Sequence, residues 1–220
     1  MFFPIQFVIR RGKTLARHAL IVATDPDSRL KGVERDAVQV KETLLKLGFE
    51  NKDIIVLDGP MVTRNQVIAA FNTMAQKSEE RSLFIFHYSG HGSPDGRLVV
   101  REPGPKLNVA QIQSLIALIK GNKLAIIDCC FAKRFKDLGK IENCAFMGAS
   151  QENQVAYERA KEGGIFTEAV VRTFNDALNR GDNYIRIARI EKVEGFKTSH
   201  NPGHQAFTLT GSVCFTARLQ

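Results

Sequence analysis

The chain has 220 residues, 44% of them hydrophobic and 25% charged, a balance typical of one soluble domain that needs no metal or disulfide to hold its core. Lys and Arg outnumber Asp and Glu by 31 to 23, but they are scattered, which favours a basic solvated surface over nucleic-acid binding. Because no apolar run reaches the roughly 18 residues of a membrane span and the start does not resemble a secretory signal, we expect a cytoplasmic protein without a membrane partner.

The elements follow one another as short apolar strands and amphipathic helices. Four helices are expected: one from about Glu34 to the stop signal Gly48, one carrying Val67 to Met74, one capped by Asn108, and one over 164–179. Strands are expected at 18–24, 53–58, 82–87, 97–100, 123–128, 143–150 and 206–210, whereas 183–194 fits neither pattern. This alternation predicts an α/β fold with a mainly parallel central sheet and helices on both faces.

Two polar sequences follow consecutive long strands. One is Tyr88-Ser89-Gly90-His91-Gly92 and the other is Asp128-Cys129-Cys130. Because the carboxyl ends of parallel strands meet at one edge of a sheet, we expect a thiol and an imidazole to lie together there, the minimum for nucleophilic attack on a carbonyl. Successive side chains of a strand point to opposite faces, so only one of the two cysteines can meet His91.

Further residues at these strand ends fit the same chemistry. Gly92 allows the backbone to come close to a substrate, and its N–H together with that of Cys130 can form an oxyanion hole. Asp128 is a carboxylate at the end of an apolar strand, where burial of a charge is costly, and this indicates a functional role.

Metal binding is a weaker interpretation of the histidines. His87 and His91 are four residues apart, as are His200 and His204, but Ser89-Gly90 and the turn around Pro202 argue against the helix that such a pair requires. We therefore predict no metal site. Cys144 and Cys214 are expected to be reduced core thiols.

The motifs resemble those of the metacaspase branch of the caspase superfamily, including the bacterial-type orthocaspases. The resemblance includes the two strand-end sequences, the segment Leu30 to Ala37, similar to L-x-G-C-x-x-D-A, and the segment Gly164 to Ala169, similar to G-x-F-T-x-A. It implies a caspase-like three-layer sandwich and a cysteine endopeptidase with Cys130 as nucleophile and His91 as its partner.

The resemblance also implies a specificity. Metacaspases cleave proteins and peptides after Arg or Lys, with acidic residues that match Asp36 and Asp128, and Ser89 is expected to line the same pocket. True caspases cleave after Asp and carry an Arg where this chain has Leu30. Two carboxylates suit the fork of a guanidinium, so we expect Arg to be preferred over Lys.

Several finer expectations follow from the resemblance. It divides the chain into an extension at 1–17 and a peptidase domain at 18–220, with a large-subunit-like part at 18–132, a basic linker at 133–142 and a small-subunit-like part at 143–220. Self-cleavage is expected in the linker, at Lys133 or Arg134. The protein is expected to be a monomer or weak dimer without a cofactor.

Calcium dependence is doubtful, because the interval between the two motifs holds too few acidic residues for a cage of six to eight oxygens. The chain also departs from the family pattern after Cys130, where Phe131-Ala132-Lys133 replaces His-Ser-Gly. The alternative function is therefore a catalytically silent caspase-fold scaffold or regulatory binding protein.

Overall fold

A computed structural model describes residues 16–101, 107–159, 162–181 and 208–210. Residues 1–15 of the expected N-terminal extension, segment 183–194, Cys214 and the pair His200 and His204 lie outside these ranges. No helix in the described part of the chain is long and apolar enough to cross a membrane.

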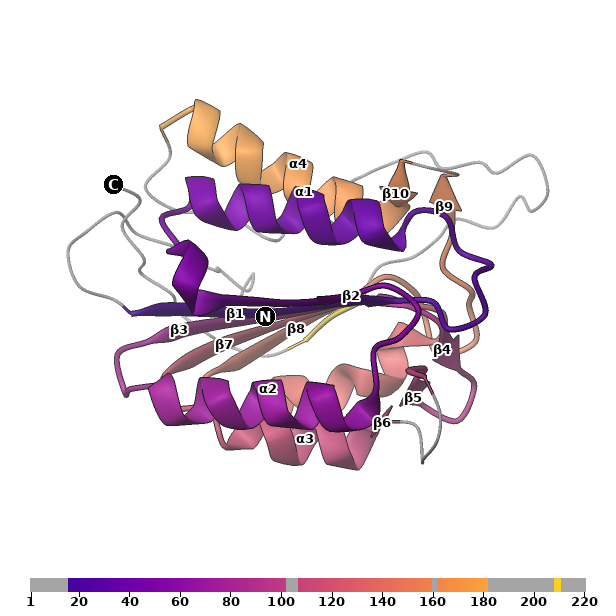
Figure 1. The fold of residues 1–220 in the computed structure, drawn as a ribbon, viewed down its shortest axis with the longest axis horizontal. Coiled ribbons are helices and arrows are strands. Elements are labelled where there is room, and N and C mark those ends of the chain that lie inside the picture. The colour runs from indigo at the N-terminus through magenta and orange to yellow at the C-terminus, as the bar shows by residue number, and fades with distance from the viewer. Residues whose placement is uncertain (1–15, 102–106, 160–161, 182–207, 211–220) are drawn as a thin grey trace, which may run out of the picture.

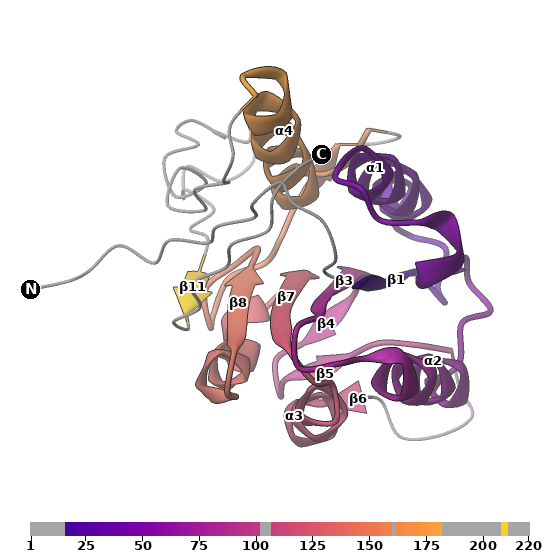
Figure 2. The same cartoon turned by 90° about the vertical axis from the view of Figure 1, so that its left-hand side faces the viewer.

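A six-stranded sheet forms the middle layer, with strand order β11-β8-β7-β3-β1-β2. Its five strands β2, β1, β3, β7 and β8 are parallel, and β11 is antiparallel to β8. Helices α1 and α4 cover one face of the sheet and α2 and α3 cover the other (Figures 1 and 2). The predicted three-layer sandwich with a mainly parallel sheet is therefore confirmed.

The elements run in chain order as follows: β1 (Arg17–Thr24), α1 (Val33–Lys46), the 3-10 helix η1 (Asn51–Asp53), β2 (Ile54–Asp58), α2 (Arg64–Lys77), β3 (Leu83–Gly90), β4 (Gly92–Ser93), β5 (Arg97–Leu98), β6 (Leu107–Asn108), α3 (Val109–Ala117), β7 (Asn122–Asp128), the 3-10 helix η2 (Ala132–Lys140), β8 (Cys144–Gly148), β9 (Glu158–Arg159), β10 (Gly163–Gly164), α4 (Ile165–Asn179) and β11 (Thr208–Thr210).

Alternation along the strands sends side chains into two separate hydrophobic cores. In β7, Leu124 and Ile126 join the core beneath α1 and α4, whereas Ala125 and Ile127 join the core beneath α2 and α3. Both faces of β1 and β3 are buried along their whole length. This explains why these strands are continuous apolar runs in the sequence.

Local signals start and stop the helices as expected. The Asn108 side chain accepts the Gln111 backbone N–H at 2.9 Å, and the Gln111 side chain accepts the Asn108 N–H in return, which completes a capping box for α3. Gly48, just after α1, has a φ of +84°, a left-handed conformation that glycine adopts without steric cost.

The basic stretch expected to be a linker has regular structure. Most of it forms η2, a 3-10 helix in which Phe135 and Leu138 are buried in the α2 and α3 core. Because the spacing of three between these apolar residues matches one 3-10 turn, the helix buries them and leaves its charged residues outside. Most of the expected linker is therefore a helix that packs on β8.

Candidate active site

Three parallel strands, β1, β3 and β7, end side by side and define the site. The register pairs Ser89 of β3 with Asp128 of β7 on one side and with Ala23 of β1 on the other. Alternation along each strand puts Ser89 and Asp128 on the face covered by α1 and α4. The next residues on that face are Cys130 and His91.

The two neighbouring cysteines have different surroundings, as the alternation predicts. Cys129 is 1% exposed and belongs to the core beneath α2 and α3. Cys130 lines a cavity of about 40 Å³ together with His91. The Ala156 backbone N–H lies 3.4 Å from the Cys130 sulfur and donates to it. Burial raises the pKa of the Cys130 thiol, and this hydrogen bond opposes the rise.

The backbone at Gly92 lies directly against the cysteine pair. A Cβ atom there would come within 2.2 Å of the Cys130 carbonyl oxygen and 2.6 Å of the Cys129 sulfur, so a larger residue does not fit without a shift. The turn that contains Gly92 is held in place by Tyr88, whose hydroxyl lies 2.8 Å from both the His91 and the Val99 carbonyl oxygens. The expected oxyanion-hole residues, Gly92 and Cys130, are therefore adjacent.

Asp36 is buried in this cavity although it sits in the first turn of α1, where a surface charge would be ordinary. Its carboxylate accepts the Ser89 hydroxyl at 2.5 Å and the Gly164 N–H at 2.9 Å. Gly163, the residue before Gly164, has a φ of +110°, and a Cβ atom at Gly163 would lie 2.3 Å from an Asp36 oxygen. The Gly163-Gly164 pair is thus what lets the chain pass so close to this carboxylate.

Asp128 also lines this cavity and is held by α4. One of its oxygens accepts both the backbone N–H and the hydroxyl of Thr167, at 2.9 and 2.7 Å. Thr167 is in the first turn of the helix, where the helix dipole favours a negative charge. The same hydroxyl lies 3.1 Å from Nε2 of the buried His87. The partner of His87 Nε2 is therefore a side chain.

Burial makes both carboxylates costly to ionise. Desolvation, followed by repulsion from Asp128, raises the pKa of Asp36 to about 8, and the Ser89 and Gly164 hydrogen bonds oppose the rise. Desolvation also raises the pKa of Asp128 to about 6, against the two Thr167 hydrogen bonds. Near neutral pH the pair therefore tends to hold one proton, mainly on Asp36.

A third carboxylate, Glu158 of β9, lines the cavity and has no counterpart among the residues expected from the sequence. It accepts the backbone N–H groups of Lys31 and Gly32 at 2.8 and 2.9 Å, and so caps the start of α1, where Gly32 offers no side chain. Its charge raises the pKa values of both Asp36 and Asp128. None of the described residues that line the cavity is Lys or Arg.

The expected self-cleavage positions lie away from this cavity, on η2. The Lys133 ammonium donates to the Gln151 side chain at 2.7 Å, and the Arg134 guanidinium lies 3.4 Å from the Glu152 carboxylate. A peptidase acts on extended chain, so cleavage there requires η2 to unwind first. Among the described residues, no group of three or more His, Cys, Asp or Glu is arranged to hold a metal ion.

Comparison with known proteins agrees with this architecture. A family model described as the caspase domain, Peptidase_C14, matches residues 16–199. Among solved structures, caspase-1 from Spodoptera frugiperda is similar with a TM-score of 0.66 and 12% identity, over 91% of this chain and 90% of that chain. At that identity the likeness concerns the fold. No curated protein sequence matches the chain. Because the family model spans most of its length, the chain belongs to the caspase domain family of cysteine peptidases.

Proposed function

We propose that this peptidase cleaves proteins after Arg, and less readily after Lys, with Cys130 as nucleophile and His91 as its proton acceptor and donor. The observation that carries the specificity is the composition of the cavity beside Cys130. Asp36, Asp128 and Glu158 all line it, and no Lys or Arg does in the part of the chain that the structure describes. A basic side chain of the substrate would supply the missing cation.

The reaction follows from the groups at the two strand ends. Cys130 gives its proton to His91, and the thiolate attacks the carbonyl carbon of the bond to be cut. The oxygen becomes negative and is stabilised by the N–H groups of Gly92 and Cys130. His91 then protonates the leaving amine as the carbon–nitrogen bond breaks, which leaves a thioester on Cys130. Water hydrolyses the thioester and frees the carboxyl product and the thiol.

The pocket favours Arg over Lys because of its geometry. Asp36 and Asp128 approach the cavity from two elements, α1 and β7, and both are fixed by hydrogen bonds. A planar guanidinium with five donors can reach two fixed carboxylates at once, whereas an ammonium acts as a single point charge. Charge-assisted bonds of this kind are each worth roughly 1.5–3 kcal/mol.

Substrate binding requires the site to open. The cavity volume of about 40 Å³ is enough for a few water molecules but not for an arginine side chain. The chain that covers it includes Ala156, whose N–H contacts the Cys130 sulfur, and Tyr157 and Glu158 on the cavity wall. We infer that this covering segment moves when substrate enters.

The test is cleavage of fluorogenic peptides that end in Arg, Lys, Asp or Leu, with and without calcium. We expect cleavage after Arg and Lys only, lost in Cys130→Ala and kept in Cys129→Ala, which removes the neighbouring buried thiol. Cleavage of the Asp peptide alone would refute the specificity. Loss of activity in Cys129→Ala with retention in Cys130→Ala would refute the choice of nucleophile.

A silent scaffold is the second candidate, favoured by the contacts around Cys130. Its thiol is covered by Ala156, and burial raises its pKa. Phe131, the next residue, has a left-handed φ of 57° and donates its N–H to Gln154, which ties the nucleophile turn to the same covering segment. A cysteine-directed acyloxymethyl ketone with Arg at its recognition position separates the two, since only an active enzyme would be labelled at Cys130.

Self-cleavage at Lys133 or Arg134 belongs to the same proposal. Both positions carry the basic side chain that the pocket is proposed to accept, although each is held in η2 by a contact to the segment after β8. Mass spectrometry of the wild type and of Cys130→Ala after prolonged incubation tests it. A wild-type chain that stays intact would remove this part of the proposal.

A further inference from the structure

Asp25 is a buried carboxylate beside His91 that the sequence motifs do not single out. It directly follows β1, the strand that pairs with β3, and its side chain is 3% exposed. Alternation along β1 puts Asp25 on the same face as Ala23, which is the face of the sheet that carries the site. The distance between Asp25 Oδ1 and His91 Nε2 is 3.2 Å.

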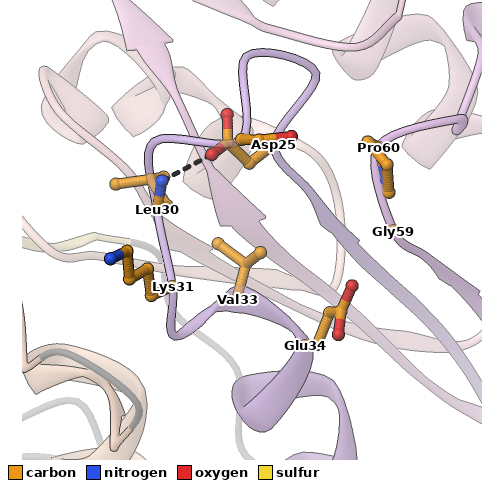
Figure 3. Close-up of a pocket in the computed structure, with 8 residues that line it drawn as sticks. Asp25, Leu30, Lys31, Val33, Glu34, Gly59 and Pro60 are labelled. Carbon is orange, nitrogen blue, oxygen red and sulfur yellow. Dashed lines mark hydrogen bonds between the residues drawn. The ribbon is translucent and has the colours of Figure 1, made fainter.

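The loop after β1 fixes the orientation of this carboxylate. Asp25 Oδ1 accepts the Asp27 N–H at 3.1 Å, and Oδ2 accepts the Leu30 N–H at 2.5 Å. Figure 3 shows the second of these bonds and the carboxylate at the edge of a neighbouring cavity of about 380 Å³, which Gly59 and Pro60 close on its far side. The backbone N–H groups of Asp27 and Leu30 thus hold the Asp25 carboxylate where it can accept a hydrogen bond from His91.

The imidazole of His91 lacks a hydrogen-bond partner that Asp25 can supply. His91 Nε2 is buried and has no hydrogen-bond partner among the described residues, although Asp25 Oδ1 lies 3.2 Å away. Alignment of Nε2–H with Asp25 Oδ1 would complete this hydrogen bond. With Nε2 bonded to a carboxylate, Nδ1 is the nitrogen left for Cys130 and for the leaving amine.

We propose that Asp25 is a positioning residue of the active site: it keeps the proton of neutral His91 on Nε2, so that Nδ1 can take the proton of Cys130. When Nδ1 accepts that proton, the ring becomes an imidazolium that still points Nε2–H at Asp25. The carboxylate stabilises this cation and takes no proton itself. The proton on Nδ1 then passes to the leaving amine. This inference rests on the proposed peptidase reaction and adds a third residue to it.

The other described groups around His91 do not provide an acceptor for its Nε2–H. Cys129 and Cys130 follow β7, Tyr88 directs its hydroxyl at the His91 carbonyl oxygen, and Tyr157 and Glu158 line the same cavity as His91. Glu158 is already bonded to the start of α1. Asp25 is therefore the carboxylate that lies against the ring, with Oδ1 3.2 Å from Nε2.

A merely structural role for Asp25, in holding its own loop, is the competing explanation. The matched comparison is Asp25→Asn against Asp27→Asn, because Asp27 carries the same charge in the same loop but is exposed. In Asp25→Asn the new amide can keep the Leu30 N–H as donor while offering its own N–H to Nε2, which favours the wrong tautomer. We expect kcat on the Arg peptide to fall by about 10²-fold or more, with KM changed by less than about threefold.

The pH profile separates positioning from loop support. Loss of the carboxylate destabilises the imidazolium, and the proposed reaction starts from neutral His91, so the acid limb of the kcat/KM profile should move to lower pH in Asp25→Asn and stay in place in Asp27→Asn. A kcat within twofold of wild type, or the same shift in Asp27→Asn, would overturn the proposal.

A second measurement needs no Asp25 variant and no activity. Nitrogen-15 NMR of histidine-labelled wild type, with the His91 signals assigned through His91→Ala, reports which nitrogen of the neutral ring is protonated. We expect the Nε2–H tautomer, and the Nδ1–H tautomer would sink the proposal even if Asp25→Asn failed to fold. Should the wild type cleave none of the peptides, the peptidase proposal fails, whereas this readout still decides the placement of the His91 proton.

Discussion

Replacement of Asp36 by Asn should stabilise the folded protein while it weakens cleavage after Arg. The pKa of Asp36 is raised from 3.8 to about 8, with burial as the largest cause. A carboxyl group whose pKa is raised on folding contributes full stability below pH 3.8, and this contribution is lost as the pH rises toward 8. Asn stays neutral throughout and can keep the Gly164 N–H as a donor.

The size of the effect follows from this pKa. The interval of about 3.2 pH units between 3.8 and neutrality, at roughly 1.36 kcal/mol for each unit, gives a destabilisation of about 4 kcal/mol at pH 7. For a domain of this size that is roughly 8–16 °C in Tm. The difference between Asp36→Asn and wild type should therefore be largest at pH 7 to 8 and vanish near pH 4.

Thermal unfolding followed by circular dichroism at pH 4 and pH 7.5 measures this difference. Glu34→Gln is the matched control, because it removes an exposed carboxylate from the same turn of α1 and should leave Tm nearly unchanged. In the same variant, Asp36→Asn, kcat/KM on the Arg peptide should fall by about 10–10²-fold, the worth of one charge-assisted hydrogen bond. A Tm gain that is equal at both pH values, or none at all, would refute the argument from burial.

Three further predictions concern the same pocket. Gly164→Ala would put a Cβ 2.2 Å from an Asp128 oxygen, so we expect a loss of about 1–3 kcal/mol in unfolding free energy, measured by urea denaturation. Thr167→Val removes the hydroxyl that joins His87 to Asp128 and leaves a buried carboxylate short of a donor, which should cost about 1–3 kcal/mol in the same assay. A reversible inhibitor that ends in arginine should bind more tightly as the pH rises from 6 to 8, because Asp36 must lose its proton. Titration calorimetry in two buffers should detect the proton released on binding, and Asp36→Asn should release fewer protons per inhibitor bound than the wild type.

The strands and helices could be predicted because their signals are local. Apolar runs such as 18–24 give β1, and Asn108 and Gly48 mark helix ends through geometry that lies within a few residues. The meeting of Ser89 with Asp128 follows from the fact that β3 and β7 are parallel neighbours. That part of the site is a consequence of topology, which the alternation of strands and helices already indicates.

Glu158 could not be predicted because its partners are far away in sequence, whereas the other features left signals that are visible in the sequence. Glu158 caps α1 by accepting the N–H groups of Gly32 and Lys31, which lie 126 and 127 residues earlier, and no pattern around Glu158 predicts this contact. Asp25 follows an apolar strand just as Asp128 does, so the rule applied to Asp128 would have found it. In η2 the basic residues concealed the spacing of Phe135 and Leu138, which marks a helix with one buried side.

The buried carboxylates and the covering segment together imply that opening and recognition are a single event. In the proposed reaction, an arginine side chain that enters displaces Ala156 from the Cys130 sulfur, and in the same step it pairs with the carboxylates of Asp36 and Asp128. A neutral side chain would have to open the same segment while the carboxylates still repel each other or hold a proton. Because only a cation recovers the free energy of desolvation that burial costs, discrimination against neutral residues arises when the nucleophile is uncovered, before the thiolate attacks.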